Sequence, residues 1–407
     1  MSINLQKEFN SYINKDYKSA INAAILIAEK YNIKIYLIGG IVRDLIMINS
    51  IKDIDITVEG NAIDFCNLLE KESNFKIIKI QENLKTAKVV YTNGTEIDFA
   101  STREEKYDIA GNLPVAYNFG CKLEQDVKRR DFTINTLAIC LSGDNKYNLI
   151  DYYKGFNDIQ NRQIKILHNK SFIDDPSRII RALKFMVRFN FNIEEETQNL
   201  INEYLINVNN LMPLERIKNE FHQYFSIDLK NIYQIIINFQ AYKLVSDNVI
   251  LAFNNDYYDD IMQYNLIAKE NKWFLYFLLM IFKSDYATER LNLNSEEKKS
   301  ISDLRELYYS KIRNDNFSIY KAFKDKSGIV LAAYYIITGS NYIKKYIEEL
   351  KDIKVLINGN DLISLGLKPS KIFNEIFDEI LKEKLNGKLE TKEDEIAFAK
   401  EFVNKHK

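Results

Sequence analysis

One stretch decides the fold of this chain: Ile35-Tyr-Leu-Ile-Gly-Gly-Ile-Val-Arg-Asp44, with Asp53-Ile-Asp-Ile-Thr-Val58 close behind it. The apolar run at its start predicts a buried strand, the glycine pair a turn, and the residues after it the start of a helix. A second strand is expected over 54–58, and alternation places Asp53 and Asp55 on one of its faces. Two carboxylates that close repel each other unless a cation lies between them. Because Gly39 and Gly40 at a helix start also offer backbone N–H groups to phosphate, the stretch predicts a site for a metal-bound triphosphate.

Composition limits the class of protein. A chain of 407 residues, 46% of them hydrophobic, is expected to divide into two to four modules with well-filled cores, and 13 glycines and 4 prolines favour long helices. The formal net charge of −1 announces no global basic field for nucleic acid, although a local basic groove remains compatible with it. The three cysteines and three histidines are scattered, which argues against a disulfide framework or a zinc site.

No apolar run reaches the length of a membrane span, and the N-terminal residues lack the core of a signal peptide. We therefore expect a cytoplasmic protein with no membrane association. No feature indicates an obligate protein partner.

The pattern changes near residue 150. Before it, short β-like runs alternate with helical patterns, and Asn93-Gly94 predicts a hairpin turn between two of the runs. After about residue 170 the apolar spacing is almost continuously helical. The expected fold class is α+β, an N-terminal α/β head followed by an all-helical remainder. The segment 107–120 is the candidate for a mobile loop beside the site, and 356–366 predicts a short helix with Asp361 as its N-cap. The expected strands are 35–38, 54–58, 75–80, 88–91, 96–100 and 136–141.

A third acidic residue, Asp98, alternates with the apolar Ile97 and Phe99. If its strand neighbours the strand of Asp53 and Asp55, three carboxylates could share two metal ions, a common arrangement for nucleotidyl displacement. An exposed strand residue is nearly as good an interpretation of Asp98.

A basic cluster follows at Arg129 and Arg130, joined by Asp131 and, four residues on, Asn135. Guanidinium groups bind phosphate bidentately, while aspartate and asparagine accept from a ribose hydroxyl. Alone, such a cluster is usually a solvated helix end. Beside a triphosphate site it predicts a nucleotide clamp.

Asp175 before Pro176 predicts a helix start, with Arg178 in the same first turn. Cytosine and adenine both carry an exocyclic amine next to a bare ring nitrogen. A carboxylate that accepts from the amine, beside an arginine that donates to the ring, would therefore select C and A over G and U.

These motifs, in order, resemble those of the class II tRNA nucleotidyltransferases, the CCA-adding enzymes that share head and neck with bacterial poly(A) polymerases. The resemblance spans about residues 39–221, and a segment at 359–366 is similar to the family's tail. One departure is visible, since Asp174 stands where the family usually has glutamate. The matching motifs are Gly39-Gly40-x-Val42-Arg43-Asp44 with Asp53-x-Asp55, Arg129-Arg130-Asp131-Phe132-Thr133-x-Asn135, Asp174-Asp175-Pro176-x-Arg178 and Glu215-Arg216-Ile217-x-x-Glu220.

The resemblance implies a polymerase-beta-type nucleotidyltransferase head over 1–150, a helical neck over 151–222, a helical body over 223–330 and a helical tail over 331–407. Body and tail would hold the acceptor arm and 3′ end of tRNA by backbone and shape. The implied substrates are CTP and ATP, and the implied cofactor is Mg²⁺, as two ions.

The resemblance also implies a role for each motif residue. Asp53 and Asp55 are the expected metal ligands, and Asp98 is the third catalytic acid. Glu215 and Arg216 are expected to support the neck. The expected nucleotide-binding residues are Gly39, Gly40, Arg43, Arg129, Arg130, Asp131, Asn135, Asp175 and Arg178.

The expected reaction is template-independent addition of CMP and AMP to a tRNA 3′ end, which is CCA addition. A CC-adding enzyme, an A-adding enzyme and a poly(A) polymerase keep the same chemistry and change the product. A catalytically inactive RNA-binding protein is the alternative from another class, and the complete set of acidic and basic motif residues argues against it.

Overall fold

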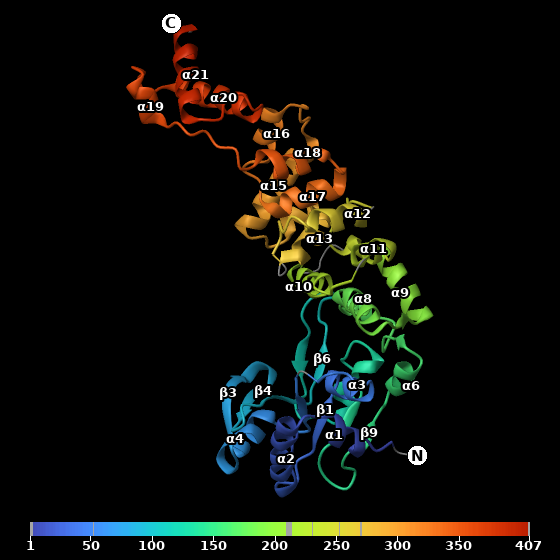
Figure 1. The fold of residues 1–407 in the computed structure, drawn as a ribbon. Helices are drawn as coiled ribbons and strands as arrows, with labels where there is room; N and C mark the ends of the chain where they lie inside the picture. The colour runs from blue at the N-terminus through green and yellow to red at the C-terminus, as the bar shows by residue number, and fades with distance from the viewer. Residues whose placement is uncertain are drawn as a thin grey trace. The chain divides into compact units, whose positions relative to one another are not determined.

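The computed structural model describes residues 3–51, 53–208, 214–229, 231–251, 253–268 and 271–405 (Figure 1). The chain divides into two compact units. The first contains Met1–Glu220 and Phe239–Leu244, and the second contains Phe221–Asn238 and Val245–Lys407. The α+β class is confirmed, because the sheet lies in the first unit and the described part of the second unit is helical. The division into head, neck, body and tail at the expected boundaries stays a prediction.

A seven-stranded sheet organises the N-terminal part of the first unit, in the order β3-β4-β5-β2-β1-β8-β9. The pair β2–β5 is parallel and the other neighbours are antiparallel. All six expected strands are present, and β4 and β5 form the hairpin that Asn93-Gly94 predicts. The strands are β1 (Ile35–Ile38), β2 (Asp55–Val58), β3 (Phe75–Gln81), β4 (Thr86–Tyr91), β5 (Glu96–Ser101), β8 (Ala138–Cys140) and β9 (Leu149–Ile150).

Two short strand pairs lie outside this sheet. The antiparallel pair β6 (Glu104–Lys106) and β7 (Val115–Tyr117) encloses most of the expected loop. The parallel pair β10 (Gln163–Ile164) and β11 (Asn192–Ile193) follows the head. Neither pair was expected from the sequence, because runs of two or three residues carry too little alternation to be seen.

Helices cover the sheet and continue the first unit beyond it. The helices α2 and α4 pack beside each other, with α4 lying on β3, β4 and β5 (Figure 1). The helices of this unit are α1 (Gln6–Tyr12), α2 (Lys15–Lys30), α3 (Gly40–Ile46), α4 (Ala62–Glu72), α5 (Leu123–Val127), α6 (Gly155–Gln160), α7 (Ser171–Asp174), α8 (Ser177–Phe189) and α9 (Glu195–Ile206). The first part of α10 (Leu214–Phe225) also belongs to it.

The start of α8 lies one residue later than Asp175-Pro176 predicts: the helix begins at Ser177, and Pro176, with helical φ, holds the N-cap position. The Asp175 carboxylate still accepts from the Ser177 N–H at 3.1 Å. Asparagine at 190, in the left-handed conformation, ends the helix. This fixed helix start determines where Arg178 and the residues one turn later lie.

The second unit is helical in its described part. Aromatic side chains contribute to its core: Phe274, Tyr276 and Phe277 are buried. A separate cluster around Ile376 and Leu362 forms the core of its C-terminal part. The helices are α11 (Ile232–Asn238), α12 (Asn255–Met262), α13 (Lys272–Ile281), α14 (Asp285–Arg290), α15 (Ser295–Tyr309), α16 (Asn316–Phe323), α17 (Gly328–Thr338), α18 (Asn341–Lys345), α19 (Gly359–Ser364), α20 (Lys371–Leu385) and α21 (Lys392–Lys405).

One expected cap is wrong. The N-cap of α19 is Asn358, whose side chain accepts from the N–H groups of Asn360 and Asp361. Asp361 lies three residues later and accepts from the Asn358 N–H, which completes a capping box. Asp361 therefore occupies the third helical position of the capping box rather than the expected N-cap.

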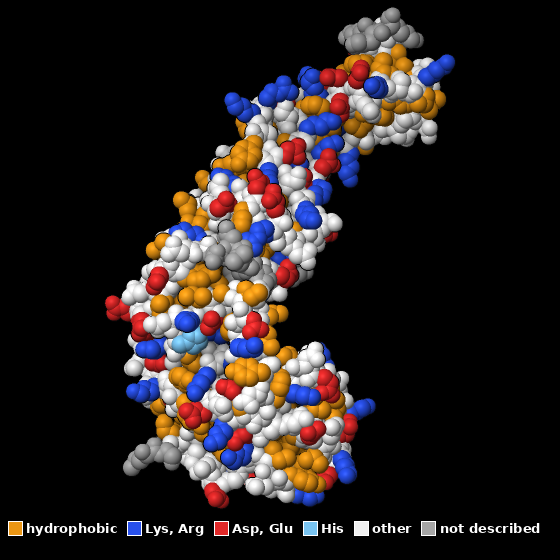
Figure 2. Space-filling view, turned by 180° about the vertical axis from the view of Figure 1, so that it is seen from behind, with side chains coloured by type: hydrophobic (Ala, Val, Ile, Leu, Met, Phe, Trp, Pro, Cys, Tyr) orange, Lys and Arg blue, Asp and Glu red, His pale blue; other side chains and the backbone are white. Residues whose placement is uncertain are grey.

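None of the helices in the described part of the chain is long and apolar enough to cross a membrane. Basic and acidic side chains are interspersed over the face drawn in Figure 2, in keeping with the formal net charge of −1.

Candidate active site

Two neighbouring strands bring the predicted catalytic carboxylates together. The parallel pair β2–β5 places Asp55 directly opposite Asp98, and Asp53 lies two residues before Asp55. We call these three residues the carboxylate edge. Asp53 and Asp55 are exposed, and Asp98 is half-exposed and forms an ion pair with Lys88 at 3.0 Å. The pairing of β2 with β5, on which the predicted role of Asp98 depended, is therefore present in the sheet.

The electrostatics of the carboxylate edge favour a cation. The surrounding protein raises the pKa of Asp55 although its surface is exposed, and the like charges of Asp98 and Asp53 raise it further. Arg130 and Lys88 act in the opposite direction. A bound cation would relieve this repulsion.

The edge fits Mg²⁺ as a partial ligand set. Among the described residues, no group of three acidic, cysteine or histidine side chains converges to hold a metal by itself. Mg²⁺ is usually held by one or two carboxylates together with substrate phosphates and water, so a preformed cage is not required. Asp53 and Asp55 meet that description, whereas Asp98 is engaged by Lys88.

The glycine turn lies against an arginine of the basic cluster. Gly39 has φ +74°, and a Cβ there would come within 2.8 Å of Nη1 of Arg130. Its N–H donates to the Leu137 carbonyl, so phosphate contacts at this turn would have to use the next N–H groups. The turn therefore needs glycine both for its conformation and to let Arg130 approach.

A cavity of about 380 Å³ lies beside this turn, within the first unit. Nine of the predicted residues line it, drawn from four separate parts of the sequence: Gly40, Arg43, Arg129, Arg130, Asp131, Asn135, Asp175, Arg178 and Arg216. Gly39, the carboxylate edge and Glu215 are not among its lining residues. Arg130 connects the two areas, because it lines the cavity and also acts electrostatically on Asp55.

The arginines of the clamp are held by acids from within the head. Arg129 forms ion pairs with Asp126 at 3.0 Å and with Glu105 at 3.2 Å. Arg130 lies 3.5 Å from Asp126, and burial lowers the pKa of its guanidinium. Held arginines lose less side-chain entropy when a phosphate binds.

Asn135 links Arg43 to Asp131. Its side-chain oxygen accepts from Nη1 of Arg43 at 2.6 Å, and its nitrogen donates to Oδ1 of Asp131 at 2.9 Å. Arg43 is buried and lies over the rings of Phe185 and Phe189. Asn135 therefore fixes the orientation of the predicted ribose-binding carboxylate.

The predicted base-reading pair is close and well supported. Nε of Arg178 lies 3.7 Å from Oδ2 of Asp175. Arg178 donates to the Ser171 hydroxyl, the Tyr107 hydroxyl and the Arg129 carbonyl. Both residues are buried, so their positions are set before any nucleotide arrives.

The residues expected to support the neck lie on α10. Two residues of this helix, one turn apart, contact Asp175 and α8. Nη2 of Arg216 donates to Oδ2 of Asp175 at 2.5 Å. Glu220, four residues later, pairs with Arg181 at 3.4 Å and with Lys184 at 2.7 Å. Glu215 lies exposed. The acid that faces α8 is therefore Glu220, which the sequence interpretation quoted in the motif but gave no role.

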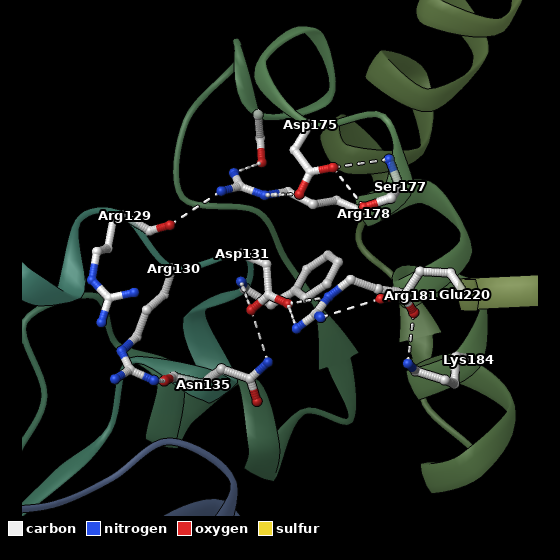
Figure 3. Close-up of polar contacts among 12 residues, drawn as sticks. Arg129, Arg130, Asp131, Asn135, Asp175, Ser177, Arg178, Arg181, Lys184 and Glu220 are labelled. Atoms are coloured by element: carbon white, nitrogen blue, oxygen red, sulfur yellow. Dashed lines mark hydrogen bonds and ion pairs between the residues drawn. The ribbon is translucent and has the colours of Figure 1, made fainter. Parts of the chain in front are cut away.

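Arg181 is the cavity-lining arginine that the sequence interpretation missed. It lines the cavity and donates from Nε to Oδ2 of Asp131 at 2.8 Å (Figure 3). Its position, one turn after Arg178 on α8, was the available signal. Its partner lies 50 residues away in the sequence, so the pairing itself was not visible.

Two buried nitrogens have no hydrogen-bond partner in the described part of the chain: Nε of Arg130 and Nη1 of Arg216. Buried donors of charged groups are costly to leave unpaired. Both arginines also line the cavity, so the cavity wall is cationic and suits a ligand rich in acceptors.

The segment expected to be a mobile loop makes hydrogen bonds at its first residue and at Gly111. Tyr107 contacts Arg178, and the Gly111 N–H donates to the Asp174 carbonyl at 3.1 Å. Leu113 at its tip is 74% exposed. The loop therefore touches both α7 and the base-reading pair.

The fold and the arrangement of the site agree with the expected nucleotidyltransferase class. Residues 35–165 match the family model described as the poly A polymerase head domain.

Relatives extend the similarity beyond the head. The A-adding tRNA nucleotidyltransferase of Halalkalibacterium halodurans is 27% identical over 99% of this chain and 96% of its own length. That of Geobacter sulfurreducens is 30% identical over 92% of this chain, which spans only 46% of that protein. A CCA-adding enzyme of Francisella tularensis is 36% identical over 53% of this chain and 56% of its own length.

Solved structures share the fold over the whole chain. The apo form II of a CCA-adding enzyme has a TM-score of 0.79 at 24% identity and covers 100% of this chain and 99% of its own. The structure of a CCA-adding enzyme with CTP gives 0.78 at 24% identity, over 99% of this chain and 97% of its own. At this identity the likeness establishes the fold.

Proposed function

We propose that this protein adds CMP and AMP from CTP and ATP to the 3′ end of tRNA without a nucleic-acid template, completing the CCA end. The observation that carries the proposal is the single cavity where the clamp residues meet Asp175 and Arg178. One cavity that combines phosphate-binding arginines with a base-reading carboxylate suits a nucleoside triphosphate chosen by its base.

Asp175 and Arg178 are the residues proposed to choose the base. A carboxylate oxygen carries two lone pairs, so Asp175 can accept from an exocyclic amine while Arg216 and Ser177 hold its orientation. Arg178 would donate to the neighbouring ring nitrogen. G and U present a carbonyl there, which would leave Asp175 facing another acceptor.

The proposed reaction forms a bond between the tRNA 3′-oxygen and the α-phosphorus, and breaks the bond from that phosphorus to pyrophosphate. The hydroxyl proton is lost to solvent. Mg²⁺ held at Asp53 and Asp55 would supply charge neutralisation and orientation for the phosphates. Arg129 and Arg130 would bind the leaving phosphates, and Asp131 with Asn135 would hold the ribose, so the residues act mainly by positioning.

The nucleotides that the protein adds to tRNA have a second candidate assignment. The relatives in Halalkalibacterium, Geobacter and Aquifex bear the name A-adding tRNA nucleotidyltransferase, whereas those in Staphylococcus and Francisella bear the name CCA-adding enzyme. Addition of A alone therefore stands beside full CCA addition.

Extension of three tRNA transcripts tests the proposal, one ending before CCA, one after C and one after CC, each with CTP, ATP or both. Completion of all three with a stop after A supports full CCA addition. Extension of the CC-ended transcript alone makes the protein an A-adding enzyme, and a stop at CC makes it a CC-adding one. Long A tracts on unrelated RNA would identify a poly(A) polymerase, and binding without any extension would leave an RNA-binding protein.

A further inference from the structure

We propose that Arg181 is a positioning residue that holds Asp131 for the ribose 2′-hydroxyl and so sets the preference for ribonucleotides over deoxyribonucleotides. The inference rests on the proposed function, because it assigns Asp131 to the ribose. It adds a residue outside the predicted site and a selectivity that base reading does not provide.

The contacts of Asp131 fix both of its oxygens. Oδ1 accepts from the Phe132 N–H and from the Asn135 amide, each at 2.9 Å. Oδ2 accepts from Nε of Arg181 at 2.8 Å and lies 2.5 Å from Nη2 of the same guanidinium as an ion pair (Figure 3). Asp131 is 7% exposed and lines the cavity. A carboxylate held on both oxygens has one orientation, in which the remaining lone pair of Oδ2 can meet a ligand.

Arg181 in turn is held from a second element. Its Nη1 lies 3.4 Å from Oε1 of Glu220 on α10. The other carboxylate oxygen of Glu220 accepts from Nζ of Lys184 at 2.7 Å. Burial would lower the pKa of Arg181, but Asp131 and Glu220 more than offset it and raise the pKa above its ordinary value. Arg181 therefore stays charged and fixed between the two acids.

The same helix carries the base-reading residues. Asp175 precedes α8, Arg178 lies in its first turn and Arg181 one turn later. One rigid helix thus sets the distance between the groups proposed to read the base and the carboxylate proposed to read the ribose. A structural brace between α8 and α10 needs only Lys184 and Glu220, whereas Arg181 adds a hydrogen bond and an ion pair to Asp131.

The test compares Arg181→Gln with Lys184→Gln on a CC-ended tRNA. Each variant removes one positive charge and one partner of Glu220 from α8, but only Arg181→Gln removes the donors on Oδ2 of Asp131. The measured quantity is kcat/KM for ATP divided by kcat/KM for 2′-deoxyATP. We expect Arg181→Gln to lower this ratio about tenfold or more, through a loss on ATP that 2′-deoxyATP does not share, since a hydrogen bond to a charged group is at stake. Lys184→Gln is expected to change it less than about twofold.

Equal losses on ATP and 2′-deoxyATP in Arg181→Gln would overturn the inference, because they would mean general support of the fold. If Arg181→Gln does not fold, Arg181→Lys serves instead. It keeps the charge but lacks the planar guanidinium whose Nε donates to Oδ2 of Asp131, and the same drop in the ratio is expected.

Equilibrium binding of ATP and of 2′-deoxyATP to the wild-type chain separates the two levels of the argument. A wild-type protein that binds neither nucleotide contradicts the proposed function and this inference together. One that extends tRNA but takes both nucleotides equally overturns the inference alone. Wild-type selectivity that persists in Arg181→Gln does the same.

Discussion

Two sets of aspartates in the first unit have opposite surroundings. The carboxylate edge of Asp53, Asp55 and Asp98 lies at the surface, where the charges of Asp98 and Asp53 repel that of Asp55. Asp131 and Asp175, which we call the arginine-held pair, are buried and bonded to Arg181 and Arg216. The same fold therefore holds aspartates that are exposed and close to like charges, and aspartates that are buried and bonded to arginine.

The difference separates two tasks. A carboxylate that lacks a permanent cation is ready for a mobile one, so the edge suits an ion that arrives with the substrate. A carboxylate with a permanent arginine cannot adapt, so the arginine-held pair suits recognition of shape and hydrogen-bond pattern. The comparison predicts that the edge governs rate while the arginine-held pair governs selectivity and stability.

The largest effect is expected at the edge. Asp55→Asn should lower the rate of tRNA extension at least about a thousandfold, because it removes a proposed metal ligand. Its thermal stability should not fall, since a repelling charge is lost. Extension kinetics and a melting curve measure the two quantities. Asp64→Asn, at an exposed aspartate on α4, is the control. A variant that melts well below the wild type would break the comparison.

Selectivity is the next effect in size. Asp175→Asn should reduce the preference for CTP and ATP over UTP and GTP by about ten- to a hundredfold, because its amide nitrogen can face a carbonyl that a carboxylate rejects. Incorporation of each of the four nucleotides measures it. The neighbouring Asp174→Asn is the matched control and should keep the preference. Loss of rate for all four nucleotides alike would assign Asp175 to the support of α8 instead.

The sequence predicted the sheet because its strands carry strong local patterns. The run 35–38 became β1 without change, and Asn93-Gly94 closed the expected hairpin. It also predicted most residues of the cavity, because charged and polar residues at fixed spacing form motifs that can be recognised without knowledge of the fold. The resemblance to a family supplied their common purpose.

The partners across the site could not be predicted. Glu220 pairs with Arg181 and Lys184 from a helix that begins 25 residues after α8 ends. Such pairs depend on how helices pack, and helical spacing says nothing about which neighbour a side chain meets. The pairing of Asp98 with Lys88 was hidden for the same reason, because it follows from the register of β4 on β5.

Stability is the third effect, and it depends on pH. Asp131→Asn should lower the free energy of unfolding by about 2 kcal/mol at pH 7, because it weakens charged hydrogen bonds around a buried group. Burial alone would raise the pKa of Asp131, but Arg181 and Asn135 hold it below the ordinary 3.8. The stabilisation is therefore present above pH 3.8 and is lost as the pH falls through the lower folded-state value. Denaturant unfolding at several pH values should show wild type and variant converging in acid.

Asp158 supplies a control of opposite sign for that measurement. Burial raises its pKa above 3.8, even though Thr133 donates to it at 2.6 Å. Its contribution is thus present at low pH and lost as the pH rises through the raised folded-state value. Relative to wild type, Asp158→Asn should be least stable in acid. The same trend for both variants would contradict the contrast in their surroundings.

The smallest expected effect tests whether Asp98 is a metal ligand, like Asp53 and Asp55, or a carboxylate held by a basic side chain. Its partner Lys88 is a third exposed, and such an ion pair adds less than about 0.5 kcal/mol to stability. Lys88→Met should therefore leave the melting curve nearly unchanged. If Asp98 is a metal ligand when released, the Mg²⁺ concentration for half-maximal extension should fall a few-fold, because Lys88 no longer competes with the ion. Lys85→Met, which removes a comparable pair with Glu82, is the control. An unchanged Mg²⁺ requirement would place Asp98 outside the metal site and leave Asp53 and Asp55 as its protein ligands.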